Sequence, residues 1–114
     1  ADASPWNSRC WVRAIIGQLG PALADCEEAL RLKPGEAAFL DSRGLVHLKA
    51  GRHDAAIADY DAALRADGKI ATSLYGRGVA RQRAGDVARG AADIAAAKAI
   101  QSDIAEEMAR YGVR

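Results

Sequence analysis

The sequence has few of the residues from which metal centres and active sites are usually built. It contains two histidines and two cysteines in 114 residues, and 5% of its residues are aromatic. His47 and His53 flank a predicted turn, so they do not form the i, i+4 histidine pair that binds a metal on one helix face. The glycines are spread along the chain instead of forming a phosphate-binding loop. We therefore expect no enzyme activity, no metal and no cofactor.

A strong charge imbalance and a long apolar run are lacking as well. The net charge is +1, whereas nucleic-acid binding usually needs a concentrated basic face. No apolar run approaches the roughly 20 residues that cross a bilayer. We therefore expect neither nucleic acid as a partner nor a membrane span. Alanine and arginine are abundant and lysine is scarce, which favours a GC-rich bacterial source.

What the sequence does contain is a regular period. Arg9, Arg43 and Arg77 are spaced 34 residues apart, and each precedes a small residue and a large apolar one. The same spacing relates other columns: Asp25, Asp59 and Asp93; Gly17, Gly51 and Gly85; Cys10, Gly44 and Gly78. Such a period is typical of repeat architectures. It divides one domain, 1–114, into the repeats 3–36, 37–70 and 71–104 without any insertion or deletion.

Each repeat is expected to form a helical hairpin. In the second repeat, apolar residues follow the i, i+3, i+4, i+7 spacing of a buried helix stripe. Gly51 is placed to end the first helix, and Asp54 lies near the start of the second. Neither helix is long enough to be stable alone, so each hairpin must stack on its neighbours. The sequence thus predicts an all-α, right-handed α-solenoid of three helix–turn–helix repeats.

The last ten residues begin a fourth block and stop. Asp103 and Glu106 are spaced as a capping box, and Gly112 is placed to end a helix. Met108 continues the column of Trp6, Leu40 and Leu74. We therefore predict a C-terminal capping helix over residues 103–112.

The periodic arginines have periodic partners. If the second hairpin turns near Arg52, Arg43 and Asp59 lie about one level apart on antiparallel helices, within reach of an arginine side chain. A guanidinium can bind a carboxylate through two parallel hydrogen bonds. We expect structural ion pairs, within or between hairpins, among Arg9, Arg43, Arg77, Asp25, Asp59 and Asp93. The alternative is a row of arginines that captures an anionic ligand.

The two cysteines also face each other. About a turn near Gln18, Cys10 and Cys26 lie at the same level on facing helices. They form either a disulfide or two buried reduced thiols that pack as small hydrophobic residues. The choice depends on the compartment, which the sequence leaves open: cytoplasmic, or periplasmic or secreted if the bridge forms.

These columns resemble the tetratricopeptide repeat family, whose helical hairpins are 34 residues long. The first repeat supplies family positions at Trp6, Ala22, Ala29 and Pro34, and the others add Gly44, Ala56, Tyr60, Ala63, Gly78 and Ala97. Gly68 and Ser102 stand where the family has proline, as at Pro34. The arginines stand where the family usually has leucine, and the arginine–glycine pairs resemble a common variant of the repeat.

The resemblance implies a concave groove, lined by the first helix of each hairpin, that holds an extended peptide or a partner helix. Carried onto this sequence, the groove residues are Asn7, Trp11, Asp41, Leu45, Leu48, Lys49, Tyr75, Val79, Gln82 and Arg83. Trp11, Leu45 and Val79 would form an apolar row with cations at its rim, unless the row packs between adjacent helices.

The resemblance favours a non-catalytic protein–protein interaction module whose partner is an unidentified protein or peptide. The alternative is a structural module that forms a homodimer through the apolar groove or through the final helix around Met108 and Tyr111.

Overall fold

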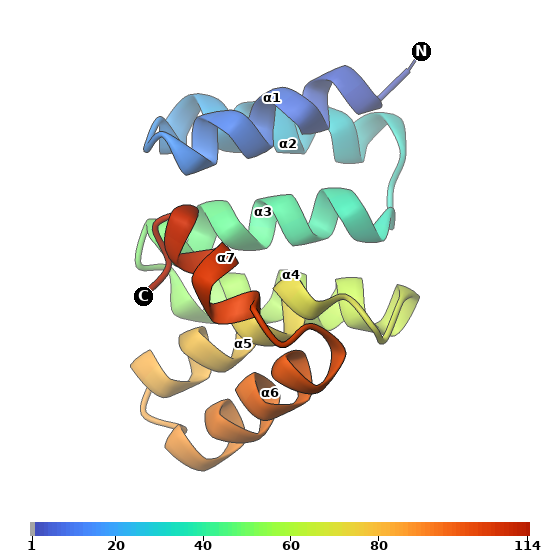
Figure 1. The fold of residues 1–114 in the computed structure, drawn as a ribbon. Helices are drawn as coiled ribbons and strands as arrows, with labels where there is room; N and C mark the ends of the chain where they lie inside the picture. The colour runs from blue at the N-terminus through green and yellow to red at the C-terminus, as the bar shows by residue number, and fades with distance from the viewer. Residues whose placement is uncertain (1) are drawn as a thin grey trace.

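The computed structural model describes residues 2–114, and their secondary structure is entirely helical. Six helices form three antiparallel pairs, and a seventh, shorter helix follows (Figure 1). The pairs are α1 (Ser4–Ile15) with α2 (Leu19–Leu32), α3 (Ala37–Lys49) with α4 (His53–Ala66), and α5 (Ala71–Arg83) with α6 (Val87–Ile100). The seventh helix is α7 (Ile104–Arg110). The predicted all-α fold of hairpin repeats is confirmed.

The turn inside each hairpin uses a glycine in the left-handed backbone region. Gly17, Gly51 and Gly85 have φ angles of 88°, 78° and 98°, and each stands two positions after the last residue of the first helix of its hairpin. Residues with side chains adopt this conformation at a cost, which is why glycine ends so many helices. The 34-residue glycine column therefore marks one turn repeated three times.

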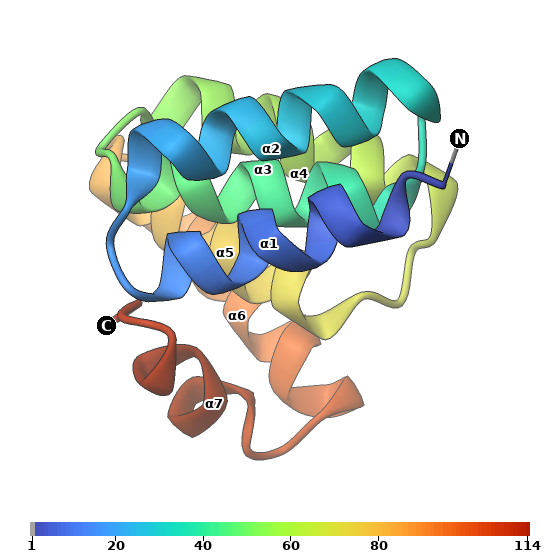
Figure 2. The same cartoon turned by 90° about the horizontal axis from the view of Figure 1, so that it is seen from above.

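The hairpins lie one upon another, as Figure 1 shows. The first helices, α1, α3 and α5, lie side by side and form what we call the inner face. Helices α2 and α4 lie on the other side of α1 and α3, whereas α6 lies beyond α5 at the end of the stack (Figures 1 and 2). One hydrophobic cluster runs through the stack, with Leu45, Leu48 and Tyr60 almost completely buried at its centre. Burial of these side chains is the main force that holds the hairpins together.

The linkers between hairpins set the stacking. Residues 33–36 join α2 to α3, and residues 67–70 join α4 to α5. In both linkers the residue before the new helix is extended, with ψ of 120° at Glu36 and 104° at Ile70. The chain therefore enters α3 and α5 in the same way, and each new hairpin is placed on the last with the same geometry.

Helix α7 departs from this pattern. Asp103, the residue before it, has ψ of 18° rather than an extended value. Helix α7 also makes only slight contact with the preceding helix α6, whereas α5 packs extensively on the preceding helix α4. The chain instead turns back, and α7 lies over the inner face (Figures 1 and 2). The helix is shorter than the predicted span of 103–112. The capping box predicted there is wrong, because the Asp103 side chain makes no capping hydrogen bond.

Candidate functional site

The arginines of the 34-residue column each bind the aspartate of their own hairpin. Arg43 donates from Nε and Nη2 to the two carboxylate oxygens of Asp59, both at 2.8 Å. Arg9 binds Asp25 and Arg77 binds Asp93 in the same two-pronged way, at 2.8–2.9 Å. Arg77 also reaches the preceding hairpin, where its Nη1 lies 3.0 Å from Asp61 Oδ1. The three arginines are thus engaged within the stack.

A second nitrogen-bearing side chain faces each aspartate from one helical turn further along the first helix. Arg13 donates to Asp25 at 2.9 Å, and Arg81 donates to Asp93 at 2.7 Å. In the middle hairpin the equivalent residue is His47, whose Nε2 lies 3.6 Å from Asp59 Oδ2. Sequence reasoning did not select this column, although its members are also 34 residues apart.

The electrostatics of these clusters fit a structural role. The hydrogen bond that Asp25 accepts from Arg9 lowers the pKa of Asp25. The hydrogen bond that Arg43 donates to Asp59 raises the pKa of Arg43. Burial lowers the pKa of His47, so its imidazole is neutral at pH 7. Asp25 is therefore ionised, and each of the three carboxylates accepts hydrogen bonds from neighbours in the fold.

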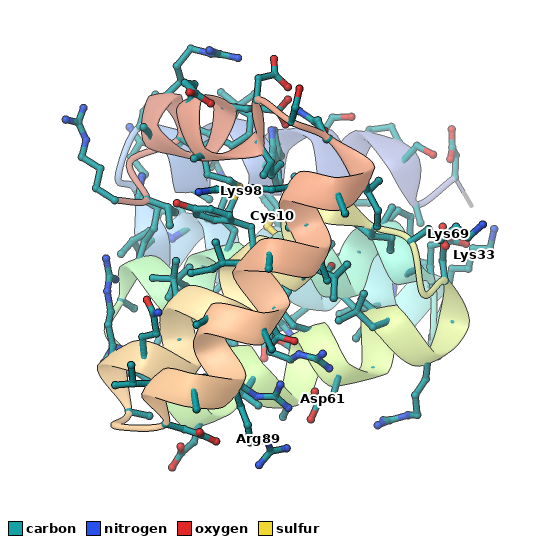
Figure 3. The ribbon with its side chains drawn as sticks, turned by 60° about the horizontal axis from the view of Figure 1, so that its bottom comes forward. Cys10, Lys33, Asp61, Lys69, Arg89 and Lys98 are labelled. Atoms are coloured by element: carbon teal, nitrogen blue, oxygen red, sulfur yellow. A yellow bond between two sulfur atoms is a disulfide. The ribbon has the colours of Figure 1, made fainter. Side chains whose placement is uncertain are left out.

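One position after each arginine, a small residue faces a larger one on the second helix. Cys10 and Cys26 are joined by a disulfide, with their Cα atoms 5.4 Å apart, and both are fully buried. Figure 3 shows Cys10 in the interior, among the packed helices. In the other hairpins the same positions pair Gly44 with Tyr60 and Gly78 with Ile94. The disulfide therefore replaces a packing contact of the repeat.

Much of the predicted apolar row is covered by the end of the same chain. Leu45, Leu48 and Val79 are 1%, 1% and 6% exposed, in the same hydrophobic cluster as Ile104, Met108 and Val113. Trp11 is half-buried, and its ring meets that of Tyr111 edge-on, with centroids 5.2 Å apart. We call residues 104–114, which comprise α7 and the residues after it, the C-terminal segment. It occupies the part of the inner face near the C-terminal ends of the first helices.

The cations predicted at the groove rim have other tasks. Lys49 Nζ donates to the carbonyl oxygens of Ala14 and Ile15, at 2.8 and 2.9 Å, and so satisfies the C-terminal end of α1. Arg83 Nη2 donates to the carbonyl oxygen of Arg114 at 2.8 Å and holds the C-terminal segment. Two more predicted groove residues are less available than expected: Tyr75 packs against the core cluster, and Gln82 lies against Gly90 of α6.

The other part of the inner face is open. A pocket of about 450 Å³ lies between the N-terminal halves of the first helices and adjoins a second of about 580 Å³. The wall of the first pocket includes the predicted residues Asn7, Trp11 and Asp41. The other residues that line the first pocket are Glu36, Ala37, Ala38, Ser42, Asp67, Ile70 and Thr72. Lys33 and Lys69 lie nearby on the linkers, at the edge of the molecule (Figure 3). We call this first cavity the open pocket.

Two polar side chains in the open pocket are unusual. The Asn7 Oδ1 atom is buried, and it has no hydrogen-bond partner among residues 2–114. Asp41 is buried, and its carboxylate accepts hydrogen bonds from the hydroxyls of Thr72 at 3.0 Å and Ser73 at 2.6 Å. Burial raises the pKa of Asp41. Buried polar groups are normally satisfied, so the unpartnered Asn7 oxygen makes this pocket suited to a ligand that donates hydrogen bonds.

Within residues 2–114 no three histidine, cysteine or acidic side chains are close enough to hold a metal ion. Nor is any helix in that range both long and apolar enough to span a membrane.

Comparison with known proteins agrees with this architecture. No curated protein matches the chain. The sequence pattern of the tetratricopeptide repeat matches residues 16–70 and again residues 42–104, so that the two matches together cover most of the chain, from the turn of the first hairpin through the third hairpin. The chain belongs to the tetratricopeptide repeat family.

Proposed function

We propose that this chain is a non-catalytic module that binds an extended peptide or a helix of a partner protein on its inner face. Tetratricopeptide repeat domains are generally protein–protein interaction modules, and they are typically non-catalytic. The family therefore gives the class of function, and the inner face is where a ligand has room to bind.

The observation that carries the proposal is the open pocket. Hydrophobic walls formed by Trp11 and Ile70 surround the unpartnered oxygen of Asn7, a combination that can hold a side chain and fix its orientation. The lining contains Glu36, Asp41 and Asp67, and no lysine or arginine. We therefore expect a ligand segment that donates hydrogen bonds from amide or cationic groups.

A pair of matched substitutions tests this site. Ala38 is exposed on α3 and lines the open pocket, and Ala24 is exposed on α2, on the other side of the stack. Ala38→Arg would fill the pocket, whereas Ala24→Arg adds the same side chain away from it. Arginine is nearly as good a helix former as alanine, so both variants should fold.

The readout is quantitative mass spectrometry of proteins that are cross-linked to each variant in its native cells. We expect the unchanged chain and Ala24→Arg to recover the same set of partner proteins. Ala38→Arg should lose this set. Equal recovery with all three chains would argue against the inner face as the binding site.

Self-association is a second candidate function, and a different surface favours it. Val12 of α1 and Ile16, the residue that follows this helix, are 55% and 61% exposed. They lie on the terminal hairpin of the stack, where a second copy could cover them. The final helix, our other expectation for a dimer contact, is less suitable because Met108 is buried within its own chain. Sedimentation at low micromolar concentration tests this, with Val12→Ser and Ile16→Ser predicted to abolish any dimer.

We infer that the chain works in an oxidising compartment, either the periplasm or the cell exterior. The disulfide between Cys10 and Cys26 supports this, because cytosolic thiols are normally kept reduced. Thiol labelling after acid quenching of intact cells would measure it. Free thiols in the freshly trapped protein would place the chain in the cytoplasm instead.

A further inference from the structure

The C-terminal segment is attached differently from every other helical element of the stack. Helix α7 has 7 residues, against 12 to 14 in the other six helices. It touches α6 slightly and packs mainly on α5. A short helix with few backbone hydrogen bonds and one main packing partner belongs to the least stable part of a fold.

The surface beneath this segment is apolar. Leu45 and Leu48 of α3 and Val79 of α5 are buried in a cluster that contains Ile104, Met108 and Val113 of the C-terminal segment. The segment packs on α5 through α7 and on Trp11 through Tyr111, so lifting it away would expose apolar surface at these places. An exposed apolar patch of this kind is typical of a binding surface.

Side-chain contacts hold the segment within α7 and at its end. Gln101 Nε2 donates to Glu107 Oε1 of α7 at 2.8 Å. Arg83 donates a hydrogen bond to the Arg114 carbonyl oxygen at a site open to water, and Tyr111 meets Trp11 edge-on. An exposed hydrogen bond contributes little net stability. The segment is thus held mainly by Ile104 and Met108, which lie one helical turn apart, and by Val113 beyond the helix.

We propose that the C-terminal segment occupies the place of a partner helix. The covered half of the inner face binds a short amphipathic helix that presents two large aliphatic side chains one turn apart and an aromatic residue one turn later. That helix displaces α7. The occupant is specified by the segment already seated there, in which Ile104, Met108 and Tyr111 have this spacing. The inference rests on the proposed function, and it names the chemistry of the partner.

The test uses the full chain and a peptide of residues 102–114. In the Met108→Glu variant a charge replaces a side chain that is 1% exposed, so α7 should leave its seat while the three hairpins stay folded. We expect this variant to bind the peptide at least tenfold more tightly than the unchanged chain does, because the competing segment is gone. A control peptide with glutamate at positions 104 and 108 should bind neither protein. Equal binding of the first peptide to both folded proteins would overturn the proposal.

Hydrogen exchange on the unchanged chain gives an answer even if Met108→Glu fails to fold. We expect the amides of α7 to exchange at least tenfold faster than those of α3 and α5, because the segment opens without unfolding the hairpins. Exchange of α7 as slow as that of α3 would overturn the proposal. The two proposals can fail separately. If Ala38→Arg loses partners but the peptide binds neither folded protein, the proposed function stands and this inference is overturned.

Discussion

The ring of Tyr60 fills the space that a side chain at Gly44 would need. A Cβ atom at Gly44 would lie 2.7 Å from Tyr60 Cε1, and Tyr60 is itself 1% exposed. The same ring is closed in on its other side by Gly76 of α5, where a Cβ atom would also collide with it. Tyr60 therefore packs between two helices through their glycines and links the second hairpin to the third.

We expect Gly44→Ala to destabilise the chain by about 1–3 kcal/mol, because the buried Tyr60 ring has no room to move away. Gly20→Ala is the matched control. Gly20 lies in α2, and a Cβ atom there would have nothing within 4 Å. Gly20→Ala should change stability little, because the helix propensity that alanine adds is offset by the crowding of its Cβ against Pro21 in the helical conformation. Urea denaturation of the two variants measures both changes, and a loss at Gly20 as large as that at Gly44 would contradict the packing argument.

The pairings across each hairpin were largely predictable from the sequence. Arg43 with Asp59 and Cys10 with Cys26 are both 16 residues apart, and a turn of fixed length places such residues on facing levels of two antiparallel helices. The reason is geometric: helices of constant rise joined by one type of turn repeat the same contacts in every hairpin. What the spacing left open was whether the cysteines are oxidised, because that depends on the compartment.

Removing Arg43 should cost more than removing Arg9. Without Arg43, Asp59 would have only His47 beside it, and burial keeps that imidazole neutral at pH 7. Without Arg9, Asp25 would retain its hydrogen bond from Arg13 at 2.9 Å. We expect Arg43→Met to destabilise by about 2–3 kcal/mol, because it leaves a buried carboxylate without a cation. Arg9→Met should have a smaller effect, because the cation at Arg13 remains. Thermal and urea denaturation compare the two variants, and equal losses would show that the second donor contributes nothing.

The placement of α7 could not be predicted from the repeat columns. Met108 continues the column of Leu40 and Leu74, which favoured a fourth stacked helix. The backbone at Asp103 decides otherwise, since it is not extended as Glu36 and Ile70 are. This conformation leaves no mark in a pattern of apolar residues.

Lys49 shows a second limit of sequence reasoning. Its position on the first helix of a hairpin predicted a rim cation, but its long side chain reaches the last carbonyl groups of α1. Flexible side chains can serve partners several ångströms from their own backbone, so a position on a helix face does not specify their role.

The disulfide should contribute strongly to stability. It joins residues separated by 16 positions, and closing a loop of that length in the unfolded chain stabilises a protein by about 3 kcal/mol. We expect reduction to lower the urea midpoint by a corresponding amount, with mass spectrometry confirming the reduced state. The double variant Cys10→Ala, Cys26→Ala should show no response to reductant. Equal stability of the oxidised and reduced chains would mean that packing alone positions the two residues.

The contribution of the buried Asp41 carboxylate to the free energy of unfolding should be larger in mild acid than at neutral pH. Its pKa is raised in the folded state, because burial penalises the charged form more than the Ser73 and Thr72 hydroxyls favour it. The folded state therefore binds a proton at a pH where the unfolded chain has released it. The contribution of Asp41 to the free energy of unfolding falls as pH rises through the folded-state pKa, and it stays low at neutral pH.

Asp41→Asn removes this charge while keeping oxygen and nitrogen atoms for Ser73 and Thr72. We expect the variant to be more stable than the unchanged chain at pH 7, and the difference to shrink as pH falls towards 4. Asp67→Asn is the control, since Asp67 lines the same pocket but is exposed, and it should change stability little at either pH. Urea denaturation at several pH values measures these differences. A loss of stability in Asp41→Asn at pH 7 would show that the hydroxyl bonds to the carboxylate outweigh its desolvation.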